Sequence, residues 1–169
     1  MHQQQNNPST NELKLYHILS SRNQTVSLAE SCTGGMVSSK IINVPGASSI
    51  IMEAFITYSN EAKINRLGVS KETLNSFGAV SHECVKEMAI NLQKLTSCDL
   101  SISVSGIAGP SGGNTDKPIG TVWFGYWYQN HVYTFMEHFS GDRFTIREQA
   151  SHYAIAKAIE ILESHSMDV

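Results

Sequence analysis

Hydrophobic and polar positions follow two periods along the 169-residue chain, one typical of strands and one typical of helices. Apolar stretches with strand character lie at residues 26–29, 50–58, 99–104, 119–128 and 132–139. Apolar positions at helical spacing lie at residues 10–23, 36–43, 60–67, 70–77, 81–95 and 143–161. Thr10, Asn60 and Ser81 are predicted helix caps, because their side-chain oxygens can accept from free backbone N–H groups. Strands interleaved with helices predict a three-layer α/β/α sandwich.

The order of the strands predicts a mixed, mostly parallel sheet. The last two strands are joined by the short turn 129–131, so at least one strand runs antiparallel. Residues 50–58 are expected to bury at least one face. Residues 99–104 alternate aliphatic side chains with serines and are expected to have one face in the core. Ligands gather at the carboxyl ends of strands in such sheets, so the turns after Ala29, Tyr58 and Val104 are expected to converge.

Composition indicates one globular domain, predicted at residues 10–165 after a disordered polar tail at 1–9. The net charge of −3 and the absence of Lys or Arg runs argue against a nucleic-acid partner. No apolar run is long enough for a membrane span or a signal peptide. The three cysteines form no Cys-x-x-Cys pair, which favours free thiols in a reducing compartment. These features predict a cytoplasmic protein without a membrane partner.

The stretch 26–35 combines a strand end, a polar cluster and the pair Gly34-Gly35 before a helix. Such a turn collects free backbone N–H groups at one point. It can bind a phosphate or an oxyanion, with Ser31 placed as a nucleophile. The alternative is a glycine-rich turn whose Ser and Thr side chains only cap the helix. The stretch alone favours neither.

Familiar catalytic motifs are absent, including Gly-x-Ser-x-Gly, Ser-x-x-Lys, Gly-x-x-x-x-Gly-Lys and His-Glu-x-x-His. The seven histidines are scattered, and no metal site is predicted. Tyr58 and Lys63 remain as partners for a serine. Lys63 is predicted in the first turn of a helix, where the dipole disfavours a cation, and burial would make its amine a base. The alternative is a strand aromatic and an exposed lysine.

Two further features carry candidate binding groups. The loop 105–113 is rich in glycine, so its backbone can approach a ligand closely, and the alternative is a surface connection. Arg143 and Arg147 are four residues apart on one predicted helix face. They can clamp a phosphate or carboxylate, or they can be a solvated pair beside Asp142 and Glu148.

Seven segments occur in order along the chain: Ala-Glu-Ser-Cys-Thr-Gly-Gly (29–35), Pro-Gly-Ala-Ser (45–48), Thr-Tyr-Ser-Asn-Glu-Ala-Lys (57–63), Leu-Gly-Val (67–69), Ser-Gly-Ile-Ala-Gly-Pro-x-Gly-Gly (105–113), Lys-Pro-Ile-Gly-Thr-Val (117–122) and Gly-Asp-Arg-x-x-Ile-Arg (141–147). Together they resemble the CinA C-terminal-domain family, the nicotinamide-nucleotide amidohydrolases, and the resemblance covers about residues 10–163. The resemblance implies hydrolysis of the carboxamide of nicotinamide mononucleotide to nicotinic acid mononucleotide and ammonia, in pyridine nucleotide recycling.

The resemblance also implies roles for single residues. Ser31 would be the nucleophile, Lys63 its general base and Tyr58 an aid to proton transfer. No metal or organic cofactor is implied. The residues implied in the oxyanion and nucleotide sites are Glu30, Cys32, Thr33, Gly34, Ser48, Ser105, Gly106, Ala108, Gly109, Arg143 and Arg147. Cys32 is expected to contribute its backbone N–H instead of its thiol.

The chain departs from the family pattern at several points. Glu53-Ala54 stands where many members have Gly-Gly, and Ser105 stands where a threonine is usual. The amino-terminal domain of longer members is absent, so the chain is expected to be a stand-alone version. Stand-alone paralogues without the activity exist, and Glu53 could reshape the pocket or approach Lys63. The alternative function is therefore an inactive module that binds a nucleotide or a partner.

An aromatic run at 123–128 predicts association. This predicted hairpin has apolar side chains on both faces, which is unusual for an edge exposed to water. A homo-oligomer is therefore expected.

Overall fold

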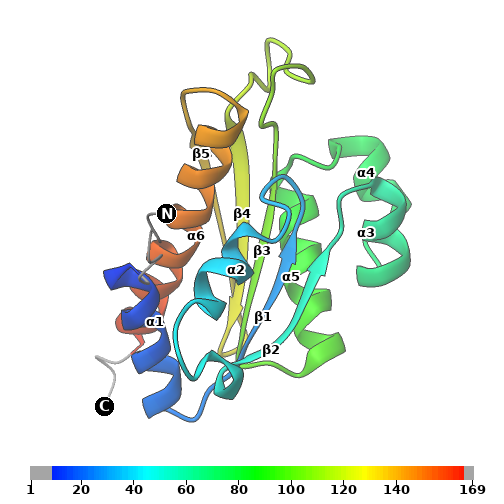
Figure 1. Ribbon diagram of the computed structural model, residues 1–169. Helices are drawn as coiled ribbons and strands as arrows, with labels where there is room; N and C mark the ends of the chain where they lie inside the picture. Colours follow the sequence, from blue (N-terminus) through cyan, green and yellow to red (C-terminus); the bar gives the residue numbers. More distant parts are fainter. Residues whose placement is uncertain (1–8, 166–169) are drawn as a thin grey trace.

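The computed structural model describes residues 9–165 and has a five-stranded sheet between two layers of helices (Figure 1). Within these residues the elements are α1 (Thr10–Ser21), β1 (Val26–Glu30), α2 (Met36–Ile42), the 3₁₀ turn η1 (Ala47–Ser49), β2 (Ile51–Ile56), α3 (Asn60–Leu67), α4 (Lys71–Phe77), α5 (His82–Thr96), β3 (Leu100–Gly106), β4 (Thr121–Tyr128), β5 (His131–His138) and α6 (Arg143–Ser164). Residues 1–8 of the predicted tail lie outside the described residues.

The strand order is β2-β1-β3-β4-β5. β1 pairs in parallel with β2 and with β3, whereas β4 pairs antiparallel with β3 and with β5. The direction therefore reverses twice, and every strand except β4 points the same way. This confirms the predicted mixed, mostly parallel sheet.

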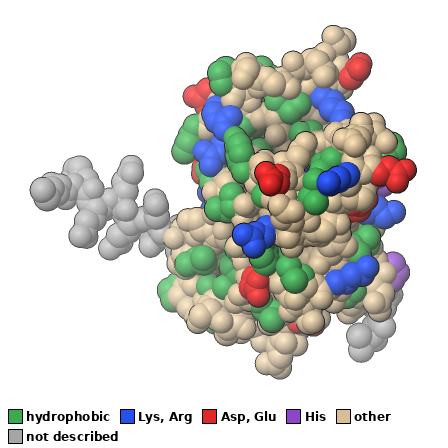
Figure 2. Space-filling view, turned by 90° about the vertical axis from the view of Figure 1, so that its right-hand side faces the viewer, with side chains coloured by type: hydrophobic (Ala, Val, Ile, Leu, Met, Phe, Trp, Pro, Cys, Tyr) green, Lys and Arg blue, Asp and Glu red, His purple; other side chains and the backbone are tan. Residues whose placement is uncertain are grey.

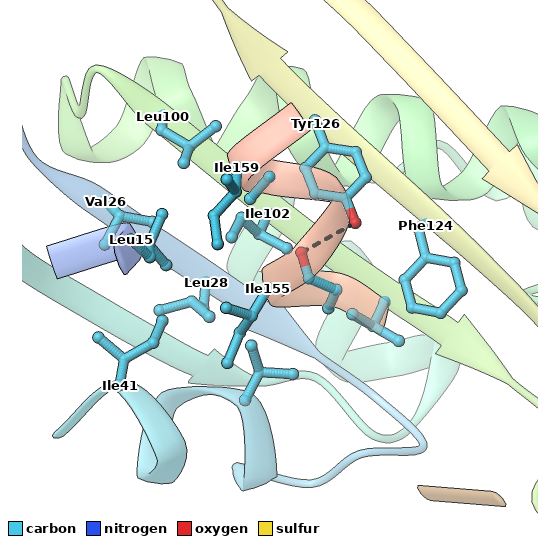
Figure 3. Close-up of a cluster of buried hydrophobic side chains, with 14 of the residues drawn as sticks. Leu15, Val26, Leu28, Ile41, Leu100, Ile102, Phe124, Tyr126, Ile155 and Ile159 are labelled. Carbon is cyan, nitrogen blue, oxygen red and sulfur yellow. Dashed lines mark hydrogen bonds between the residues drawn. The ribbon is translucent and has the colours of Figure 1, made fainter. Parts of the chain in front are cut away.

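Helices α1, α2 and α6 contact one another on one face of the sheet, and α3 and α4 pack on α5 at the other (Figure 1). The larger core lies under α6, where aliphatic side chains of β1 and β3 meet those of α1, α2 and α6 (Figure 3). The Tyr126 hydroxyl in this core donates to the Ala154 carbonyl oxygen at 3.1 Å. A smaller core under α3 and α4 includes Leu67, Leu74 and Met88. The three-layer prediction is thus confirmed.

Two predicted helix caps are wrong by one residue. Ser9, which the sequence placed in the disordered tail, is the N-cap of α1, and Glu12 accepts from its backbone N–H at 2.6 Å. Ser59 caps α3, since its hydroxyl accepts from the Ala62 N–H at 3.0 Å. Neighbouring polar residues offer similar capping groups, and the preceding turn selects between them. The predicted cap Ser81 is confirmed.

The expected core face of β3 is confirmed, because Leu100, Ile102 and Val104 lie in the larger core, and the serine face is buried as well. The hydroxyls of Ser101 and Ser103 donate to the carbonyl oxygens of Ala89 and Val85 in α5, each at 2.7 Å. Because serine side chains are short, α5 can lie close to β3, and the buried hydroxyl groups still have hydrogen-bond acceptors. On the neighbouring strand a Cβ at Gly125 would clash with the Val85 carbonyl oxygen, so glycine is required for the same close approach.

The two outer strands differ from the sequence expectation. β2 is an edge strand whose residues are mostly exposed or half-buried, including Met52 and Ile56 at 49% and 59% exposure. The prediction of a buried face there is wrong. The aromatic strand β4 is not an edge, because β5 lies outside it, and its side chains Phe124, Tyr126 and Tyr128 are buried. The argument for association from a free aromatic edge therefore fails.

Among residues 9–165, no helix has the length and apolar character needed to cross a bilayer. The three cysteines are free and buried. Charged side chains of both signs are spread over the face that includes α3 and α4, with no concentration of Lys and Arg (Figure 2).

Candidate functional site

A pocket of about 320 Å³ lies beyond the carboxyl ends of β1, β2 and β3. The segments that follow these strands all contribute to it, which confirms the predicted convergence. Its lining residues are Ser31, Cys32, Tyr58, Lys63, Ala79, Val80, Ser105, Gly106, Ile107, Ala108, Gly109, Ser111, Gly112 and Arg143.

The turn between β1 and α2 is held by the buried carboxylate of Glu30. It accepts hydrogen bonds from the backbone N–H groups of Gly35, Val37 and Ser38 at 2.8–3.1 Å, and from the Ser38 hydroxyl at 2.9 Å. Gly34 and Gly35 have φ values of 58° and 96°, a left-handed conformation that glycine adopts without strain. The carboxylate replaces the missing acceptors at the start of α2. Glu30 is thus a capping residue, and its predicted place in the substrate site is wrong.

Two N–H groups of this turn remain available. The Ser31 N–H donates to the Val104 carbonyl oxygen at 3.0 Å, and the Gly34 N–H donates to the Ser31 carbonyl oxygen at 3.1 Å. Within the described part of the chain, the N–H groups of Cys32 and Thr33 donate to no other residue. The unpaired donors of the turn are therefore the two that directly follow Ser31.

Ser31 and Lys63 meet in the pocket. The Lys63 Nζ lies 3.0 Å from the Ser31 Oγ, and both residues are buried, at 1% and 7% exposure. The same Nζ donates to the Thr57 carbonyl oxygen at 2.7 Å and lies 3.5 Å from that of Tyr58. A neutral amine has two N–H bonds and one lone pair. If the two carbonyls take the N–H bonds, the lone pair faces the Ser31 hydroxyl.

Burial favours this neutral amine. It lowers the pKa of Lys63 from its ordinary value of 10.5, against a smaller opposing influence of the Cys84 and Cys32 thiols. Lys63 forms no ion pair with a carboxylate of residues 9–165 that would offset the desolvation of its charge. It also lies in the first turn of α3, at the positive end of the helix dipole. The arrangement can remove a proton from Ser31.

The phenol of Tyr58 points to another partner. The side chain is 59% exposed, and its hydroxyl accepts from Arg143 Nη2 at 2.7 Å. Arg143 Nη1 also donates to the Gly109 carbonyl oxygen at 2.7 Å, so this arginine joins two walls of the pocket. Tyr58 reaches Lys63 only through its backbone carbonyl group. The phenol therefore organises Arg143 instead of contacting the serine and lysine.

Several predicted binding residues lie elsewhere. Arg147 donates from Nε to the Cys32 carbonyl oxygen at 2.8 Å and from Nη2 to that of Thr33 at 2.9 Å, so it does not join Arg143 in the pocket. Neither Thr33 nor Gly34 lines the pocket, and the Thr33 side chain is fully buried, so Thr33 can contribute only the backbone N–H that follows Cys32. Ser48 is an exposed residue of η1, which precedes β2 and so lies at the opposite end of the sheet.

The predicted loop residues Ser105, Gly106, Ala108 and Gly109 do line the pocket. A Cβ at Gly106 would lie 2.9 Å from the Thr121 carbonyl oxygen, which explains the glycine there. Four residues contribute to the site although the sequence did not indicate them as site residues. They are Thr57, Ala79, Val80 and Ile107. Thr57 acts through its carbonyl group and the other three offer apolar side chains, so none has a chemical signature in the sequence.

The positions of Cys32 and Glu53 answer two questions that the sequence left open, namely whether the Cys32 thiol takes part and whether Glu53 affects the pocket. Burial raises the pKa of the Cys32 thiol to about 12, so the thiol stays protonated at neutral pH and is a poor nucleophile. Glu53 is exposed on β2 and does not line the pocket. The expectation that it reshapes the pocket or approaches Lys63 is wrong.

Within residues 9–165, no three His, Cys, Asp or Glu side chains form a group that could hold a metal ion.

Comparison with solved structures shows the same fold throughout. The competence damage-inducible protein A of Klebsiella pneumoniae superposes with a TM-score of 0.89 at 36% identity, covering 94% of this chain and 98% of that one. A CinA superfamily protein of Escherichia coli superposes with a TM-score of 0.85 at 30% identity, covering 95% and 99%.

The relatives found by sequence comparison are longer than this chain, which matches about a third of their length. It is 51% identical over 146 residues to a putative competence-damage inducible protein of Caldicellulosiruptor saccharolyticus, and 45% identical over 151 residues to a CinA-like protein of Petrotoga mobilis. The matches cover 86% and 89% of this chain but 36% and 38% of those proteins. The family model of the CinA C-terminal domain matches residues 9–162. The chain therefore belongs to the CinA C-terminal domain family.

Proposed function

We propose that this protein hydrolyses the carboxamide of nicotinamide mononucleotide, with Ser31 as nucleophile and Lys63 as general base. The observation that supports this most is the 3.0 Å approach of a buried lysine amine to a serine hydroxyl in a pocket, where the amine has no carboxylate partner among residues 9–165. Serine–lysine pairs of this kind activate a hydroxyl without histidine. The substrate comes from the family resemblance.

In the proposed reaction the Ser31 hydroxyl donates its proton to the Lys63 amine while Oγ attacks the amide carbon. The N–H groups of Cys32 and Thr33 stabilise the oxyanion, a contribution of about 3–4 kcal/mol per donor in comparable sites. The C–N bond then breaks, and the leaving nitrogen takes the proton from Lys63 and departs as ammonia. Lys63 then takes a proton from a water molecule as its oxygen attacks the acyl carbon. The bond from this carbon to the Ser31 Oγ breaks, Ser31 takes the proton back from Lys63, and the nicotinic acid product is released.

The rest of the pocket suits the nucleotide portion of the substrate. Arg143 offers a cation at the wall that Tyr58 and Gly109 form, where it would bind the phosphate. Ser105, Gly106 and Ala108 would contact the pyridine ring and ribose from the adjoining loop. The reaction needs no metal or organic cofactor. Because the cysteines are free thiols, we propose a cytoplasmic location.

The test is ammonia release by the purified protein from nicotinamide mononucleotide, its riboside and nicotinamide, measured side by side. Turnover of the mononucleotide well above that of the other two is expected. Equal turnover of all three would contradict the nucleotide specificity. Saturable mononucleotide binding without ammonia release would instead identify a binding module.

The pH dependence of turnover tests Lys63 as the base. Burial lowers the pKa of this amine, and only the neutral amine accepts the Ser31 proton. The value of kcat/KM is therefore expected to rise with pH through the lowered pKa and to level off above it, short of the ordinary value of 10.5. The measurement is the initial rate of ammonia release between about pH 5 and 9. A rate that falls over this range would mean that the ammonium form is required.

We also propose that the protein forms a homo-oligomer through the β2 edge. Met52 and Ile56 on this strand and Ile42 on α2 are 49%, 59% and 60% exposed. An apolar edge strand with unpaired backbone groups favours pairing with a second copy. Light scattering at micromolar concentration is expected to give a mass above 18.6 kDa, and Met52→Lys is expected to lower it. A wild-type monomer mass would contradict this proposal.

A further inference from the structure

Arg147 makes two hydrogen bonds to the turn that carries Ser31. Its Nε and Nη2 donate to the consecutive carbonyl oxygens of Cys32 and Thr33, at 2.8 and 2.9 Å. The arginine lies in the second turn of α6, between Ile146 and Ala150, whose side chains are buried in the main core. A planar guanidinium that donates twice from a fixed helix sets the direction of both carbonyl groups.

The direction of a carbonyl group fixes the direction of an N–H group. In a trans peptide the C=O and the N–H point to opposite sides of one plane. The Cys32 carbonyl and the Thr33 N–H share a peptide plane, so the bond to Arg147 directs the Thr33 N–H away from the arginine. The next peptide plane contains the Thr33 carbonyl and the Gly34 N–H. Both of these groups are held, because the carbonyl accepts from Arg147 and the N–H donates to the Ser31 carbonyl oxygen.

The turn is thus held from two directions. Glu30 accepts from the N–H groups of Gly35, Val37 and Ser38, and Arg147 donates to the carbonyls of Cys32 and Thr33. Together with the Ser31 and Gly34 bonds, these contacts leave the Cys32 and Thr33 N–H groups unpaired within the described residues. A cationic donor on the Cys32 carbonyl also polarises the peptide and strengthens its N–H as a donor.

We propose that Arg147 is a positioning residue that orients and polarises the Thr33 N–H toward the oxyanion formed at Ser31. This inference rests on the proposed serine mechanism, but not on the identity of the substrate. Arg147 therefore acts through the backbone of the turn and does not bind the phosphate, consistent with its absence from the pocket lining.

The test compares Arg147→Gln and Arg147→Lys with Arg66→Gln, which removes an exposed arginine of α3. For Arg147→Gln, kcat is expected to fall about 10- to 100-fold with KM within about two-fold, because the donor is misplaced and not removed. Arg147→Lys keeps the charge but not the paired contact, so its loss is expected to be smaller. The phosphonylation rate of Ser31 by a neutral alkyl fluorophosphonate, followed by intact mass, is expected to fall in parallel.

The phosphonate probe separates this inference from the proposed substrate. It places a P=O oxygen at the oxyanion position and needs no nucleotide site, so labelled wild type without ammonia release would reject only the substrate. If the Arg147 variants lose only turnover of the mononucleotide, with a raised KM and an unchanged rate of Ser31 phosphonylation, Arg147 would be a phosphate ligand. This result would overturn the inference. Equal labelling of wild type and both Arg147 variants, or no labelling of wild type, would also overturn it.

Discussion

Replacing Ser31 with alanine is expected to lower ammonia release from nicotinamide mononucleotide by at least about 10³-fold, because the proposed acyl-enzyme forms on its Oγ and Lys63 lies 3.0 Å from that atom. The neighbouring Cys32 thiol does not substitute, since burial raises its pKa to about 12. Removing one buried hydroxyl leaves the fold intact, so thermal unfolding is expected within a few degrees of wild type. The measurement is coupled ammonia detection at saturating substrate.

Lys63→Met is expected to lower ammonia release about as much as Ser31→Ala does, because without the amine the serine keeps its proton. Methionine fills much of the same buried volume, so stability is expected to be equal to or above that of wild type. The matched control is Lys71→Met, an exposed lysine in the first turn of the next helix, which is expected to keep full activity. Residual turnover above about one-tenth of wild type in Ser31→Ala or Lys63→Met would rule out the proposed serine–lysine mechanism.

The strand and helix pattern was predictable because it depends on local periodicity. The order Val26, Leu28, Ala29 predicts a buried strand, and the Gly34-Gly35 pair predicts the turn, from neighbours in sequence alone. The serine face of β3 was not predictable in this way. Ser101 and Ser103 are buried only because α5 brings acceptor carbonyl groups to them, and those acceptors are 12 and 18 residues away.

Residue type made Ser31 and Lys63 candidates, and the family resemblance gave them their proposed roles, but the contacts around them were not predictable. The turn and the predicted helix start alone left the alternatives open, because a serine can cap a helix and a lysine can be exposed. Arg147 and Tyr58 were assigned to substrate or proton transfer, whereas their polar groups contact the chain itself. A charged side chain has the same signature whether its partner is a ligand or a backbone carbonyl. Only three-dimensional packing separates the two.

Glu30→Gln is expected to lower the free energy of unfolding by about 2–4 kcal/mol, the largest stability effect of any change considered. The carboxylate accepts four hydrogen bonds, and an amide in its place presents an NH₂ group to donors. At least one backbone N–H at the start of α2 then stays buried and unpaired, at the cost of its desolvation. Urea unfolding measures the change, with Glu53→Gln on the exposed edge strand as control, expected within about 0.5 kcal/mol of wild type.

The same substitution is expected to slow turnover, because Glu30 and Arg147 hold the two sides of one turn. If the amides after Ser31 depend on both contacts, Glu30→Gln lowers kcat even under conditions where the protein is fully folded. Glu30→Gln and Arg147→Gln combined are then expected to cost less than the sum of the single effects, since either loss already releases the turn. A fully additive double mutant would show that the two contacts act on separate steps. Full activity in folded Glu30→Gln would show that α2 needs its cap only for stability.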